Sequence, residues 1–242
     1  WKLKLFYSIV TIACLYGMFM SGARAGMYVL IGTALAYVFL SRNWKMFSIA
    51  LTGLILLVVF MVFTGRGNGI SAIRRMRTAF NLESNESVQV RDTNKEAISK
   101  YLSEAPMGIG LGKSDSNIPE HNRYYVVAVT APDSTLVYIW TRAGIIGVSI
   151  FCFVSLLILI RGTTIVWFKL KDQELRTTCA TFIAGAAGWF AAGYANQIYF
   201  QYPNSFIIFG MLTIVFMAPH LEQKELEKKK QLARISSDSN EN

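Results

Sequence analysis

The stretch FSIALTGLILLVVFMVF (residues 47–63) contains no charged side chain, and a long polar segment begins where it ends. Six apolar segments occur along the chain, and they cover residues 5–20, 27–40, 47–63, 136–160, 178–200 and 205–218. A helix needs about 20 residues to cross a bilayer, so the second and last segments span only with the help of flanking residues. The pattern predicts an all-α membrane protein, a polytopic helical bundle with about six transmembrane helices.

Composition supports a membrane protein and argues against a soluble one. Charged residues make up 16% of the chain, apolar residues make up 53%, and the mean hydropathy is +0.37, whereas soluble domains carry roughly a quarter charged residues. The formal charge of +9 comes from basic residues beside and between the apolar segments, which indicates membrane topology and no nucleic-acid partner. Cys14, Cys152 and Cys179 all lie inside apolar segments, so neither a disulfide framework nor a metal site is predicted. No cofactor is predicted either.

The short basic segments predict the orientation of the helices. Lys and Arg gather at alternate ends of the apolar segments, at positions Lys2, Lys4, Arg42, Lys45, Arg161, Lys169, Lys171, Arg176, Lys224, Lys228, Lys229, Lys230 and Arg234. The positive-inside rule makes these ends cytoplasmic. The chain then divides into three helices (1–63), an external loop (64–135), three helices (136–219) and a charged cytoplasmic tail (220–242), helical at first and then disordered. Trp1 is not an initiator Met, and no A-x-A-like cleavage site follows the first segment, so we read no signal peptide. Because the chain starts abruptly, we expect an amino-terminal part to precede Trp1.

The fifth apolar segment carries small residues at three- and four-residue spacings within residues 184–193. Such residues allow two helices to approach closely in lipid. Its external end, residues 196–202, is polar and aromatic. This end is either an interfacial aromatic belt or a rim that stacks on sugar rings.

The first external feature is the run Ser21-Gly22-Ala23-Arg24-Ala25-Gly26. The neighbours of Arg24 are too small to shield it, so its guanidinium is free to bind phosphate oxygens as a bidentate fork. The alternative is an interfacial arginine that reaches toward lipid phosphates. Both readings remain open from this stretch alone.

The external loop is predicted to contain two helices and a glycine-rich turn. Residues 70–80 repeat apolar side chains at helical spacing and carry three arginines, Arg74 among them, which indicates an amphipathic helix on anionic headgroups. A second helix covers residues 87–102, carries Arg91, and ends before Pro106. The glycines of the turn Pro106-Met107-Gly108-Ile109-Gly110-Leu111-Gly112 then allow its backbone to approach a neighbouring group closely. The turn is followed by Lys113-Ser114, but Met107 stands where a P-loop has its first glycine, so no nucleotide site is predicted here.

Two side chains near the end of the loop are candidate proton acceptors. His121 is the only histidine on the predicted external face, and Asp133 sits where the chain re-enters the bilayer. The alternatives are an exposed loop histidine and a helix cap, since Asp and Ser commonly cap helices. Arg142, about two turns into the same helix, faces either the site or Asp133, and an ionisable residue inside a membrane helix points to function.

The order of these features resembles a known family. Ser-Gly-x-Arg at an external helix mouth is followed by a loop arginine, a helix ending in Pro-Met-Gly-Ile-Gly-Leu-Gly, and a polar pair before Gly144-Ile145-Ile146-Gly147. Over about residues 8–219 the chain resembles the carboxy-terminal half of the bacterial O-antigen ligase and polymerase superfamily. The resemblance implies a membrane glycosyltransferase in O-antigen (lipopolysaccharide) or exopolysaccharide biosynthesis.

The resemblance also implies roles for matching residues. Arg24 and Arg91 would hold the donor diphosphate. The chain departs from the family at Lys95, where a tryptophan is frequent, and at Asp133-Ser134, where His-Asn is usual. Spacing favours Asp133 and residue type favours His121, so we place Asp133 first and His121 second as the acceptor-side group. The substrate-binding residues predicted with them are Ser21, Arg24, Arg74, Arg91, Gly108, Gly110 and Arg142.

The implied reaction is a metal-independent, inverting displacement. A glycan passes from an undecaprenyl-diphosphate-linked oligosaccharide to the hydroxyl of a glycan or lipid A-core acceptor, as in a polymerase or a ligase. The implied location is the bacterial inner membrane, with the loop on the periplasmic side. Two alternatives are a polysaccharide exporter or flippase, and a non-catalytic membrane subunit of a surface-polysaccharide assembly.

Overall fold

The structure is a computed structural model of residues 1–242. It describes the chain except residues 22–23, 42–43, 64–68, 70–73, 75–85, 113–117, 133 and 241–242. For some helical residues, among them Arg24, Arg91 and residues 233–240, only the backbone is described.

Each of the six predicted apolar segments forms a helix. They are α1 (Lys2–Ser21), α2 (Arg24–Ser41), α3 (Trp44–Phe63), α7 (Thr135–Thr164), α8 (Gln173–Ala192) and α9 (Asn204–Asn240). In the described part of the chain, the shorter helices α5 (Glu86–Leu102) and α6 (Tyr125–Val129) lie between α3 and α7. The described residues contain no strand, so the predicted all-α class is confirmed.

Among the described residues, two segments are long and apolar enough to cross a membrane by themselves. One is Thr135–Lys169, which joins α7 to the π-helical turn η2 (Ile165–Lys169), and the other is Asn204–Leu232 of α9. Much of α7 exposes large apolar side chains, including Ile150 and Phe153, as expected of a surface that faces lipid. Membrane character therefore agrees with the prediction, and the six-span topology stays a prediction.

The fifth and sixth segments differ from the prediction at their ends. Helix α8 ends at Ala192, before the predicted end at residue 200, and a 3-10 turn, η3 (Ile198–Phe200), follows it. The end at Ala192 is stabilised by tertiary contact, because the backbone N–H of Thr135 donates to the carbonyl of Gly193 (2.9 Å). Helix α9 continues through the charged tail to Asn240. The predicted disorder of the tail is therefore wrong as far as Asn240, in keeping with its many Glu, Lys, Gln and Leu residues, which are good helix formers.

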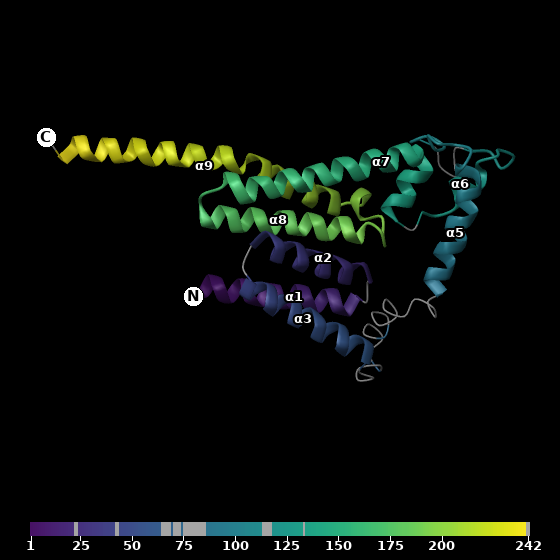
Figure 1. Cartoon of the computed structure of the whole chain (residues 1–242), viewed down its shortest axis with the longest axis horizontal. Coiled ribbons are helices and arrows are strands. Elements are labelled where there is room, and N and C mark those ends of the chain that lie inside the picture. The colour runs from purple at the N-terminus through teal and green to yellow at the C-terminus, as the bar shows by residue number, and fades with distance from the viewer. Residues whose placement is uncertain are drawn as a thin grey trace.

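The helices form a bundle whose ends differ in character. In Figure 1, α2, α7 and α9 begin, and α1, α3 and α8 finish, at the end where α5 and α6 lie. This end is called the loop end. The carboxy terminus and the connection from α7 to α8 lie at the opposite end. The bundle thus gathers the predicted external elements on one side.

Helices α2 and α8 cross at glycines. A Cβ added to Gly32 would lie 2.9 Å from the Cα of Gly188, and a Cβ on Gly188 would lie 2.6 Å from the Val29 carbonyl oxygen. Real Cβ atoms need more room than this, so the two backbones pack against each other without intervening side chains. The predicted close approach of a helix to the small residues of segment 184–193 is confirmed at Gly188.

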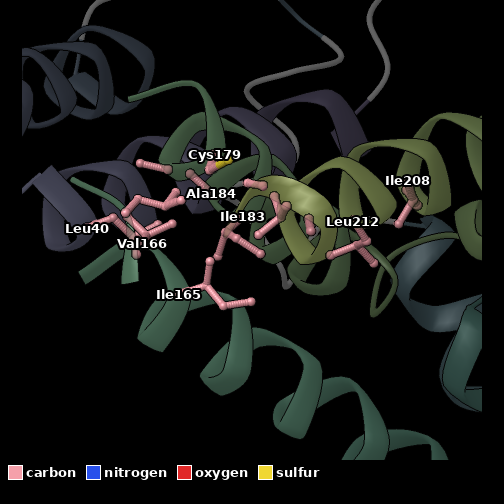
Figure 2. Close-up of a cluster of buried hydrophobic side chains, with 13 residues drawn as sticks. Leu40, Ile165, Val166, Cys179, Ile183, Ala184, Ile208 and Leu212 are labelled. Atoms are coloured by element: carbon pink, nitrogen blue, oxygen red, sulfur yellow. The ribbon is translucent and has the colours of Figure 1, made fainter. Parts of the chain in front are cut away.

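The main hydrophobic core joins elements from both halves of the chain. Figure 2 shows Leu40 of α2, Val166 of η2, Ile183 of α8 and Leu212 of α9 converging in it. The indole N–H of Trp167 also donates to the carbonyl of Leu40 (3.1 Å). Burial of these side chains fixes α2 against α8 and α9, and so fixes which helix ends meet at the loop end.

Candidate active site

Helix α7 is broken near its loop end. Gly144 has φ 65° and ψ −168°, which is non-helical, and glycine tolerates this positive φ because it has no Cβ. The break divides α7 into a loop-end piece, residues 135–143, and a longer piece that runs to Thr164. The sequence reading predicted one continuous helix here, and that prediction was wrong at Gly144.

The glycine-rich turn between α5 and α6 docks into this break. The N–H of Ile109 donates to the carbonyl of Thr141 (2.9 Å), and the N–H of Gly110 donates to the carbonyl of Arg142 (3.0 Å). Gly108 and Gly110 have positive φ, 72° and 105°. The predicted close backbone approach of this turn is confirmed, and its partner is the backbone of α7.

Glycine is required on both sides of this contact. A Cβ on Gly108 would lie 2.6 Å from the Gly144 nitrogen and 2.8 Å from the Ala143 nitrogen. A Cβ on Gly144 would collide with the carbonyl of Pro106. Neither position therefore accepts a side chain without separating the turn from the helix.

The start of α7 is held by the end of α8. The Ser134 hydroxyl caps α7 by accepting the N–H of Val137 (3.1 Å), so the cap expected here is supplied by Ser134. The Thr135 hydroxyl donates to the carbonyl of Asn196 (3.0 Å), and the Gln197 side chain donates to the carbonyl of Pro132. The chain on either side of position 133 is thus fixed to the segment that follows α8. Position 133 itself, the predicted Asp133, lies outside the described residues.

A small hydrophobic cluster attaches α5 and α6 to the loop-end piece of α7. Ile98 and Leu102 of α5 and Val127 of α6 are buried together, and Val137 and Trp140 of α7 pack against them. The predicted second loop helix, residues 87–102, is confirmed by α5 (Glu86–Leu102). Arg91 lies in α5, about two turns before Ile98, and the structure describes its backbone alone.

Arg142 lies next to the docked turn. Its guanidinium carbon is 5.7 Å from the centroid of the Tyr138 ring, and that ring packs on the ring of Phe200 from η3 at 5.0 Å between centroids. The Nη1 atom of Arg142 is buried and has no hydrogen-bond partner among the residues that the structure describes. A buried cationic donor without an acceptor is costly, so an anionic group at this position would be stabilised.

The remaining predicted residues lie on separate elements of the chain. Arg24 is the first residue of α2, and the hydroxyl of Ser21, the last residue of α1, donates to the carbonyl of Met18 (2.7 Å). His121 is exposed in the segment before α6, and Arg74 is helical and exposed. The rest of the predicted helix 70–80 lies outside the described residues.

Electrostatic contacts close to His121 belong to the loop itself. Arg123 forms an ion pair with Glu104, and the Asn122 side chain accepts the N–H of Tyr124 (2.9 Å). In the described residues, no three His, Cys, Asp or Glu side chains come close enough to share a metal ion. The contacts therefore fix the loop segment that carries His121 to the end of α5.

Sequence reasoning missed three parts of this arrangement: the break at Gly144, the tie from Thr135 to the end of α8, and the Tyr138 and Phe200 rings beside Arg142. The available signal was a glycine within an apolar helix, which suggests a close approach of backbone. The spacing of residues along the chain gave no indication of which loop segment would approach Gly144.

Comparison with known proteins gives one family match. A family model described as O-antigen ligase matches residues 9–152. This range contains every residue predicted for the site, together with the break in α7 and the docked turn. No curated protein and no solved structure matches the chain.

Proposed function

This chain belongs to the O-antigen ligase family, and on that basis we propose that it moves a glycan from an undecaprenyl-diphosphate donor to an acceptor hydroxyl at the loop end. The acceptor is a second lipid-linked glycan in a polymerase and a lipid A core in a ligase. The reaction takes place on the periplasmic side of a bacterial inner membrane, so α5, α6 and the docked turn face the periplasm.

The observation that carries this proposal is the Nη1 atom of Arg142, which is buried beside the docked turn and has no hydrogen-bond partner in the described part of the chain. The leaving group of the reaction is a diphosphate, which gains negative charge as the sugar departs. A guanidinium binds such oxygens through strong charge-assisted hydrogen bonds. Groups that meet charge as it develops in the transition state commonly contribute the largest part of the rate.

Arg24 and Arg91 complete the donor site in this proposal. Both are carried by elements of the loop end, at the start of α2 and in the external helix α5. We assign them to the two phosphates, and we assign Arg142 to the phosphate oxygen that leaves the sugar. Three guanidinium groups supply enough positive charge to act without a divalent ion.

The acceptor hydroxyl needs a proton acceptor, and Asp133 is the first choice. Its neighbours Pro132, Ser134 and Thr135 are all held by hydrogen bonds at the start of α7, whereas His121 lies in an exposed part of the loop. The acceptor oxygen bonds to the anomeric carbon, its proton passes to the carboxylate, and the bond from that carbon to the donor phosphate oxygen breaks. A single displacement inverts the anomeric carbon, and a positioned base contributes about 10²–10⁴-fold.

The test is glycan transfer by purified protein in lipid, with a synthetic undecaprenyl-diphosphate oligosaccharide, an acceptor of each class and EDTA. We expect product in EDTA, and we expect Arg142→Ala to lower kcat/KM by about 10²-fold. Arg142→Lys should recover only part of this, because an ammonium lacks the planar fork. Arg161→Ala is the matched control, since Arg161 is an exposed arginine near the far end of α7.

Two results would count against the proposal. Full transfer by Arg142→Ala would remove Arg142 from the donor site. Absence of transfer by the unmodified protein with both acceptor classes would instead support a non-catalytic subunit or an exporter.

A further inference from the structure

We propose that the turn formed by Pro106, Gly108, Ile109 and Gly110 is a positioning element that sets the orientation of the loop-end piece of α7. This inference rests on the proposed function, because its consequence is the placement of Arg142 and of the start of α7 relative to the donor. It assigns the turn no contact with substrate. The turn acts through the helix.

Hydrogen bonds at the break join the turn to α7. In an uninterrupted helix the carbonyls of Thr141 and Arg142 would accept the N–H groups four residues later. The non-helical backbone of Gly144 interrupts that ladder, and the N–H groups of Ile109 and Gly110 bond to these two carbonyls instead. The loop thus supplies hydrogen bonds to two carbonyls that have lost their helical partners.

The contact between the turn and α7 joins backbone to backbone. Gly108 meets Arg142, Ala143 and Gly144 at distances that leave no room for a Cβ on either side. A contact between two backbones has little freedom to shift, because no flexible side chain lies between them. The direction of the loop-end piece is therefore set by the shape of the turn.

The loop-end piece of α7 is held at both of its ends. At its start, the Thr135 hydroxyl and N–H bond to the segment that follows α8. At its finish, the turn binds Thr141 and Arg142, and Ile109 packs against the cluster around Ile98. Residues 135–143 span about 13 Å of helix, and both restraints come from distant parts of the chain.

The candidate chemistry lies at these two ends. Ser134 and the preceding position 133 lie at the start, and Arg142 lies at the finish, with its carbonyl bonded to Gly110. A displacement of about 1 Å in a reacting group can lower a rate by about 10²-fold. Loss of the docked turn should therefore lower kcat even though no residue of the turn touches the donor.

The experiment compares Gly108→Ala with Gly112→Ala in the full-length protein in lipid. A Cβ at Gly112 meets nothing within 4 Å among the described residues, which makes it the matched control in the same segment. Hydrogen exchange of the Ile109 and Gly110 amides reports docking, and glycan transfer reports kcat and KM. We expect Gly108→Ala to lose amide protection and to lower kcat by 10- to 100-fold with a smaller change in KM, and we expect Gly112→Ala to change neither.

Gly110→Ala is a second variant in case Gly108→Ala does not fold. Its φ of 105° strains any residue with a Cβ, so it should weaken docking in the same direction. The inference fails if either variant loses protection of the two amides while kcat stays unchanged, or if those amides exchange freely in the unmodified protein. Protected amides in a protein that transfers no glycan would leave the docked turn intact and overturn the proposed function instead.

Discussion

Replacing Gly188 by alanine tests the crossing that fixes α2 against α8. The new Cβ would lie 2.6 Å from the Val29 oxygen and 2.8 Å from the Thr33 nitrogen. Raising the first separation to the 3.4 Å of an ordinary contact moves the helices apart by about 0.8 Å. Overpacking of this kind costs about 1–3 kcal/mol, and an alanine gains about 0.5–1 kcal/mol in a helix. We expect a net loss of about 1–2 kcal/mol.

Gly210→Ala is the control for this substitution. Gly210 is also helical, in α9, and a Cβ there meets nothing within 4 Å. It should stabilise the protein by about 0.5–1 kcal/mol. Thermal unfolding in one detergent measures both variants, and at about 2–4 °C per kcal/mol the two midpoints should differ by several degrees.

The same variant has a functional consequence. Arg24 lies at the loop end of α2, so a shift at the crossing reaches the proposed donor site, and KM for the lipid-linked oligosaccharide should rise in Gly188→Ala. Equal stabilisation of both variants would refute the close crossing. A destabilised Gly188→Ala with unchanged KM would separate the crossing from the position of Arg24.

Two further predictions concern the start of α7. Thr135→Val removes the hydroxyl that donates to Asn196, so it should destabilise the protein by about 1 kcal/mol and lower glycan transfer. Thr135→Ser keeps the hydroxyl and should retain both stability and transfer. Unfolding and transfer assays on the two variants decide this. Asp133→Asn should abolish transfer while His121→Ala retains it, and the reverse result would show that His121 is the acceptor-side group.

Much of the fold follows from local sequence. Six apolar segments gave six helices, and the loop helix predicted at residues 87–102 is α5 (Glu86–Leu102), because periodicity and a following proline act over a few residues. The break at Gly144 does not follow from local sequence. Its two freed carbonyls are satisfied by Ile109 and Gly110, and only tertiary contact determines that those residues arrive there.

The candidate site was predictable to a similar degree. Sequence identified the glycines of the turn and Arg142 separately, and the structure joins them at one point of α7. It could not identify Tyr138 and Phe200 as the aromatic neighbours of Arg142, since η3 reaches α7 only through the turn that ends α8. Arg24 and Arg91 share the loop end, and their roles stay predictions.

The broken helix also bears on how the loop relates to the membrane. Irregular backbone at membrane depth is tolerated only where protein covers it, because lipid offers no hydrogen-bond partners. Gly144 is buried, and the carbonyls beside it are bonded to the turn. If α7 crosses the bilayer, as its length and apolar surface allow, the turn is part of the protein wall at the membrane boundary. In the proposed mechanism, a donor anchored in lipid by its polyprenyl chain would then meet Arg142 beside this turn. The loop between α3 and α7 would be required for helix geometry as well as for contact with substrate.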